Sequence, residues 1–211
     1  RLKADRTLKD GCSLPHDWMT QPHPVCNTIH EKDLTLFYSE SSTAVEEDVR
    51  LAADGFWRDV WKVRDYKDSL MATKTLRYEH DYSDRNFDRH QRDAIALERT
   101  ASSSYITDIF GFCGHTSFGE LADGSVSDMI WPETGEKCDV SMKDRLDVAL
   151  SIAKGLRDFH YPPFNDGTDI QRLESVAMSH TDITPSQFLF VNGKIKLVRT
   201  SSACIHYLNI M

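Results

Sequence analysis

The order in which the spacing of apolar residues changes along the chain restricts the fold more than any other feature. From residue 49 to residue 121 the apolar residues mostly alternate with polar ones, as in strands, around one helical stretch. A long helical pattern then occupies residues 141–160, and two short strand-like segments follow it. Strands grouped first and helices later, without regular alternation of the two, indicate an α+β fold.

The strand-like part of the chain predicts a five-stranded antiparallel sheet with one helix. The expected strands are a hairpin over 49–63 that turns at Gly55, then 70–77, 105–113 and 118–121. The helix is expected over 84–101, with one apolar face formed by Phe87, Ala94, Leu97 and Ala101. Asp123-Gly124-Ser125 predicts a turn after the last strand.

The second part of the chain contains the two clearest local signals. Ser141 can cap the long helix, whose apolar stripe consists of Leu146, Ala149, Leu150, Ala153 and Leu156. Asn192-Gly193 joins the segments 188–191 and 194–198 and is typical of a type I′ hairpin. We expect the stripe of the long helix to be partly exposed, which favours association.

Composition excludes some classes of protein. The chain has 211 residues, 40% of them apolar, which is enough for a packed core. Its 33 acidic and 25 basic residues give a net charge of −8 without a basic stripe, so we expect no nucleic-acid partner. No apolar run approaches the roughly 18 residues that span a bilayer, so we expect no membrane span within this chain.

Three short motifs follow one another in an order that has chemical meaning. The hairpin contains Ala53-Asp54-Gly55-Phe56-Trp57-Arg58-Asp59-Val60, and the next strand contains Met71-Ala72-Thr73-Lys74. Beyond the long helix lies His180-Thr181-Asp182-Ile183-Thr184-Pro185-Ser186-Gln187-Phe188-Leu189. Over about residues 49–198 this order resembles a eukaryotic protein kinase: a glycine-rich hairpin, a strand lysine and a catalytic loop.

The resemblance implies a nucleotide site for ATP in the first part of the chain. Ala53, Gly55 and Val60 would lie over the phosphates and adenine, and Lys74 would bind the phosphates. The helix carboxylate that pairs with this lysine would be Asp93 or Glu98, although a charged helix residue in water is an equally good interpretation. Glu120 and Leu121, after Phe118-Gly119, would bind adenine through their backbone. Arg58 stands where the family has glycine, and would either block the phosphates or contact them.

The resemblance also assigns roles in the catalytic loop. Asp182 would be the base that orients the acceptor hydroxyl, His180 would be structural, and Gln187 would replace the asparagine that binds magnesium. Thr181 and Thr184 replace the family's arginine and lysine. A metal-binding aspartate is expected next to the last strand, but Arg199 occupies its place, so Mg²⁺ is a weaker expectation than ATP.

These features predict four segments. They are an irregular arm over 1–47, a kinase-like N-lobe over 48–121, a partial C-lobe over 122–198 and a tail over 199–211 that does not match the family. We interpret the residues after Leu197 as foreign to the family pattern, as a frameshift or a retained intron would make them. The amine of Lys74 and the carboxylate of Asp182 are expected to face one cleft.

Three functions follow from the resemblance. The first is phosphoryl transfer from ATP to a protein hydroxyl, impaired here because the charge-neutralising groups are missing. The second is a pseudokinase, a binding or scaffold module that acts on a partner protein without catalysis. The third is a kinase-fold enzyme that phosphorylates sugars in the secretory pathway, suggested by the N-terminal arm alone.

The arm contains Cys12, His16, His23, Cys26 and His30 within 19 residues. A Cys12–Cys26 disulfide, free thiols and a metal site all remain open, with the disulfide favoured if the chain is secreted and the metal least. The arm loosely resembles those of some secretory-pathway and algal kinase-like proteins. The compartment therefore stays open between the secretory pathway, a membrane anchor and the cytoplasm.

Overall fold

The computed structural model describes Cys26 and residues 49–64, 69–132, 140–162, 177–198 and 204–206. These residues form an α+β protein, as the order of the apolar patterns predicts. The chain divides into two compact units. Unit 1 comprises residues 1–94 and 109–121, and unit 2 comprises residues 95–108 and 122–211.

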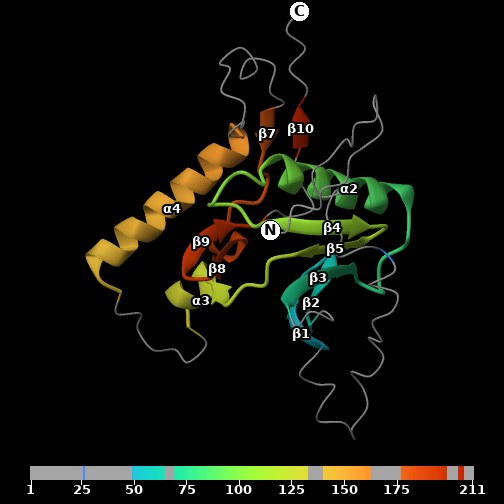
Figure 1. Ribbon diagram of the computed structural model, residues 1–211, viewed down its shortest axis with the longest axis horizontal. Coiled ribbons are helices and arrows are strands. Elements are labelled where there is room, and N and C mark those ends of the chain that lie inside the picture. The colour runs from blue at the N-terminus through green and yellow to red at the C-terminus, as the bar shows by residue number, and fades with distance from the viewer. Residues whose placement is uncertain are drawn as a thin grey trace, which may run out of the picture. The chain divides into compact units, whose positions relative to one another are not determined.

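Unit 1 contains the five-stranded antiparallel sheet, which confirms that prediction. Its strands are β1 (Val49–Asp54), β2 (Arg58–Arg64), β3 (Leu70–Leu76), β4 (Ile109–Cys113) and β5 (Thr116–Gly119). They lie in the order β1-β2-β3-β5-β4 (Figure 1). The strand expected over 105–113 is wrong in its first half. The backbones of Tyr105 and Thr107 instead bond to Leu197 within unit 2.

The two faces of this sheet differ in chemistry. Val49, Val63, Met71 and Phe118 form an apolar cluster, with Trp61 and Phe110 packed against it. Because side chains alternate along a strand, residues 58, 60 and 74 point to the opposite face. Val60 and Lys74 are direct cross-strand partners in the register of β2 and β3. One face thus carries this apolar cluster, and the other carries Arg58 and Lys74 together with the buried Ala72 and Leu76.

Helix α2 (Asp84–Arg99) contributes its first part to unit 1. The Phe87 N–H donates to the Ser83 carbonyl at its start, and the Thr100 hydroxyl donates to the Ala96 carbonyl at its end. Ala94 and Leu97 are buried as the apolar pattern predicts, whereas Phe87 remains 38% exposed. The predicted helix is therefore confirmed, and it ends two residues earlier than expected.

Unit 2 is built from short strands and two further helices. Its elements are β6 (Gly124–Ser125), α3 (Val126–Ile130), α4 (Met142–His160), β7 (Ala177–Ser179), the 3₁₀ helix η3 (Pro185–Gln187), β8 (Phe188–Val191), β9 (Lys194–Leu197) and β10 (Cys204–His206). One sheet has the order β6-β8-β9, and β7 pairs with β10. Asp123-Gly124-Ser125, predicted as a turn after the last strand, leads into α3. Gly124 and Ser125 pair with β8, and the Ser125 side chain caps α3.

Helix α4 and the β8–β9 hairpin confirm the two clearest local predictions. The Ser141 hydroxyl accepts a hydrogen bond from the Asp144 N–H and caps α4. Asn192 and Gly193 have φ values of 50° and 72°, the conformation that a type I′ turn requires. Gly155 allows α4 to lie close to the backbone of Tyr105, because a Cβ at residue 155 would lie 3.1 Å from the Tyr105 carbonyl oxygen.

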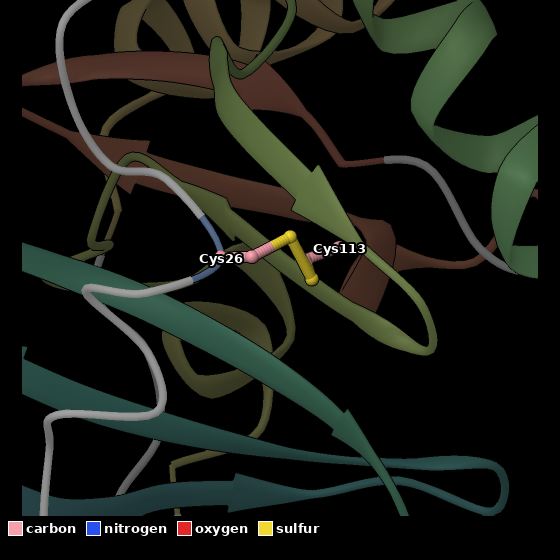
Figure 2. Close-up of a disulfide and its surroundings, with 2 residues drawn as sticks. All are labelled: Cys26 and Cys113. Carbon is pink, nitrogen blue, oxygen red and sulfur yellow. A yellow bond between two sulfur atoms is a disulfide. The ribbon is translucent and has the colours of Figure 1, made fainter.

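Two long-range links in the structure were not predicted. β10 lies in the segment 199–211 and pairs with β7, residue 205 opposite residue 178. Cys26 forms a disulfide with Cys113 at the end of β4 (Figure 2). The expected Cys12–Cys26 disulfide is therefore wrong, as are the free-thiol and metal alternatives for Cys26. Proximity in sequence misleads here because β4 brings a cysteine 87 residues away to within bonding distance.

Candidate functional site

The turn between β1 and β2 is a tight hairpin at the edge of unit 1. The Gly55 N–H donates to the Arg58 carbonyl at 2.9 Å, and the Gly55 carbonyl accepts from the Arg77 side chain at 3.0 Å. A Cβ on Gly55 would lie 3.1 Å from the Arg58 carbonyl oxygen, so glycine is favoured here. Ala53 is exposed and Val60 is half-buried.

Arg58 does not reach outward from this hairpin. Its guanidinium is 8% exposed and forms an ion pair with the Asp93 carboxylate, which is 3% exposed. The two residues are 35 positions apart and join β2 to α2. Of the two roles considered for Arg58, neither describes this geometry, because the side chain is directed to a carboxylate inside unit 1.

Lys74 lies on the same face of the sheet, two strand positions from Arg58. Burial, followed by the positive charge of Arg58, lowers the pKa of Lys74 to about 8, although the Asp93 carboxylate acts to raise it. The ion pair of Asp93 is with Arg58, and not with Lys74 as the resemblance implied. Three charged groups thus gather here with two cations for one carboxylate.

The other residues expected at the nucleotide site in unit 1 lie further along the chain. Glu120 and Leu121 follow β5 directly and are half-buried. Glu98, the alternative to Asp93, lies near the end of α2 and is also half-buried. Glu98 belongs to unit 2, whereas Asp93 belongs to unit 1 and its charge acts on Lys74.

In unit 2, the segment from His180 to Gln187 forms an ordered loop before β8. The Asp182 N–H donates to His180 Nδ1 at 3.3 Å, and His180 Nε2 lies 3.3 Å from the Val198 carbonyl oxygen. The buried His180 ring packs edge-on against Phe159 at 5.5 Å between centroids. The imidazole therefore fixes the backbone of the loop, a structural role.

Asp182 itself is half-buried and interacts with a side chain of the same loop. Gln187 Nε2 donates to Asp182 Oδ2 at 3.1 Å. The Gln187 carbonyl accepts from the Val198 N–H at 2.8 Å, and the Gln187 N–H donates to the Thr184 carbonyl at 3.0 Å. The backbone groups of Gln187 thus hold the loop in shape, and its side-chain amide orients the Asp182 carboxylate.

These residues fit an anion better than a metal ion. The Lys74 amine is a donor suited to phosphate oxygens, whereas the guanidinium of Arg58 is engaged with Asp93. Gln187 directs its amide nitrogen to Asp182, whereas magnesium requires oxygen ligands. Within the described residues, no three side chains of His, Cys, Asp or Glu gather as a metal site would need. Arg199 lies outside the described residues.

Two polar interactions, one at Asp158 and one between two histidines, were not predicted from the sequence. Asp158 in α4 accepts from the Ser103 hydroxyl at 2.7 Å and from Arg157 Nε at 2.7 Å. His90 and His115 bring their Nδ1 atoms within 3.2 Å of each other. Burial, followed by the charge of Arg58, lowers the pKa of His90 to about 4. Neither has a sequence signal: Asp158 lies on the side of α4 opposite the predicted apolar stripe, and the two histidines are 25 positions apart.

No helix among the described residues is both long and apolar enough to span a bilayer. In comparisons with known proteins, no family model matches the chain and no curated protein matches it at a significant level.

Proposed function

We propose that this chain is a protein kinase-like binding module that holds a nucleotide by its phosphates and transfers the phosphoryl group weakly or not at all. The observation that carries the proposal is the grouping of Lys74 with the buried Arg58–Asp93 ion pair on one face of the five-stranded sheet. The remaining support comes from the motif order along residues 49–198.

The charge balance around Lys74 favours an anionic ligand. Asp93 is paired with Arg58, so among the residues that the structure describes the amine of Lys74 has no carboxylate of its own. Its lowered pKa reports that the charged form is poorly compensated in the free protein. A phosphate group beside Lys74 would supply the missing negative charge and restore the ammonium form.

The groups that assist transfer are the ones this chain lacks. Phosphoryl transfer depends on positioning and on neutralising charge in the transition state. Thr184 replaces the loop lysine, and Gln187 is engaged with Asp182 through its amide nitrogen. Asp182 keeps the position of the family's base, but the groups that would hold magnesium around it do not fit that ion. Binding without turnover is therefore the expected behaviour.

Isothermal titration with ATP and with ADP, each in the presence of EDTA or of magnesium, tests the proposal. We expect binding that does not require magnesium, with proton uptake at pH 8–9 because the phosphates raise the pKa of Lys74. Repeating the titration in buffers of different ionisation enthalpy measures that uptake. The K74M variant should lose most of the affinity, and K62M, a lysine replaced on the same sheet, should not.

Two results would contradict the proposal. Absence of ATP and ADP binding under all four conditions would leave only a scaffold without nucleotide. Magnesium-dependent phosphoryl transfer that disappears in D182N would instead identify an active phosphotransferase.

A further inference from the structure

A second polar site lies in unit 1, away from Lys74, where the hairpin tip approaches the start of α2. It is a depression of about 330 Å³, a volume at the lower end of the range of small-molecule sites. Its lining comes from the hairpin, from the segment after β3 and from the first turns of α2: Trp57, Glu79, His80, Asp81, Ser83, Arg85, Asn86 and Arg89. None of these residues belongs to the proposed nucleotide site.

Arg89 is held in this depression by aromatic rings. Its guanidinium carbon lies 4.0 Å from the centroid of the Trp57 ring. The Trp57 ring lies 4.5 Å from that of His80, and a His80 ring nitrogen lies 2.6 Å from the Phe56 carbonyl oxygen. This stack positions a planar guanidinium without using its N–H donors. The arginine is therefore oriented before any ligand arrives.

Among the described residues neither Arg85 nor Arg89 has an ion pair, and Arg89 Nη1 has no hydrogen-bond partner. They are four residues apart on α2, so their charges repel each other. Burial, followed by the charges of Arg85 and Arg92, lowers the pKa of Arg89 from its ordinary value.

Two acidic residues, Glu79 and Asp81, also line the depression without forming an ion pair with either arginine among the described residues. Glu79 accepts from Arg77 Nη2 at 3.4 Å, and because Arg77 also lies within ion-pair distance of Asp54 and Asp59, this contact compensates the Glu79 charge only in part. The Asp81 backbone carbonyl accepts from Asn86 Nδ2 at 2.8 Å, which shapes the wall of the depression. The Asp81 carboxylate remains at this site, and it limits the ligand to one anionic group instead of a polyanion.

We infer that this depression binds a tetrahedral oxyanion, a phosphate or sulfate group, through the stacked guanidinium of Arg89 and the neighbouring Arg85. Arginine donates two parallel N–H groups to such an anion, and its stacked orientation reduces the entropy lost on binding. Inorganic phosphate and inorganic sulfate share this chemistry. Titrating each of them separately shows which of the two anions the depression binds more tightly.

The test uses the full chain, titrated at pH 7 with phosphate, sulfate or chloride at constant ionic strength. The readout is the indole N–H signal of Trp57 in a ¹H–¹⁵N spectrum, assigned with W57F. We expect a saturable shift with phosphate or sulfate, and none with chloride. R89M should weaken binding at least tenfold. R85Q, which changes an exposed side chain, should weaken it about threefold while the fold is retained.

The matched control is R99M, which removes an exposed arginine from the last turn of the same helix. It should bind the oxyanion as the unmodified chain does. An equal shift in chloride, or the same loss of affinity in R99M as in R85Q, would show general screening of charge and overturn the inference. Unchanged affinity in both R85Q and R89M would overturn it as well.

Discussion

Two buried carboxylates, Asp93 in unit 1 and Asp158 in unit 2, have different surroundings. Asp158 accepts from a hydroxyl and from the arginine next to it in sequence, whose side chain is 64% exposed. Asp93 is paired with a guanidinium that is itself buried, and a second cation, Lys74, lies beside the pair. Water can take the place of the exposed Arg157 beside Asp158, but it cannot take the place of the buried Arg58 beside Asp93.

The difference separates a structural group from a functional candidate. A buried acid that is satisfied by nearby donors joins two segments and leaves no charge uncompensated. A buried cluster with two cations for one anion is costly in the free protein, and such clusters concentrate at binding sites. The comparison therefore points to Asp93 and its neighbours as the functional centre, and to Asp158 as a connection between α4 and the Ser103 turn.

The largest expected effect comes from removing the charge of each acid. D93N should lower the free energy of unfolding by about 3–5 kcal/mol, because it leaves Arg58 buried without a counter-charge. D158N should lower it by about 1–3 kcal/mol, since Ser103 keeps an acceptor and Arg157 is solvated. Urea unfolding followed by circular dichroism measures both. Equal losses in the two variants would remove the distinction.

Removing the disulfide of unit 1 is expected to have the next largest effect on stability. C113S should lower the free energy of unfolding by about 2–4 kcal/mol, because Cys26–Cys113 closes a long loop in the unfolded chain. Non-reducing peptide mapping should recover one peptide that contains both cysteines. C12S is the control and should change neither result. A peptide that links Cys12 to Cys26 would contradict the pairing seen in Figure 2.

The pH dependence of stability tests the cation beside Asp93. The pKa of Lys74 is about 8 in the folded protein and 10.5 in an unperturbed lysine. The unfolded chain therefore holds more protons between these values, and stability should rise as pH increases from about 8 to 10.5. K74M should remove this rise and stabilise the protein at pH 7 by about 1–2 kcal/mol.

Urea midpoints measured at several pH values between 7 and 10.5 give this slope. K62M serves as the control, because it removes a lysine from the same sheet and should retain the rise. A flat profile in the unmodified chain would show that Lys74 is solvated, and the contrast between the two carboxylates would then rest on Arg58 alone.

The smallest effect on stability is expected on the outer stripe of α4. Met142, Leu146 and Leu150 are spaced four residues apart and are 70%, 63% and 53% exposed. L150K should change the free energy of unfolding by no more than about 0.5 kcal/mol, as surface substitutions usually do. It should reduce association in light scattering, because a charge interrupts the apolar stripe. Association that is unchanged in L150K would show that this stripe is not involved.

Much of the local structure was predictable because it depends on residues close in sequence. Ser141 caps α4, Asn192-Gly193 forms the β8–β9 turn, and alternation over 49–63 gives the first hairpin. The first half of the strand expected over 105–113 was wrong because residues 105–107 bond to Leu197, which local propensity cannot report. Where a strand begins and ends thus depends on its hydrogen-bond partners, whereas the presence of the strand could be predicted from local sequence.

The candidate site shows the same division. Lys74 and Asp93 could be named from their motifs, but the pairing of Asp93 with Arg58 in place of Lys74 could not. The sequence alone determined the α+β order, the sheet of alternating strands and the charged residues at the start of β2, on β3 and on α2. Only the tertiary structure decided that Arg58 takes the Asp93 carboxylate and that Cys26 joins Cys113. These contacts connect residues 35 and 87 positions apart, and folding, not local preference, brings such residues together.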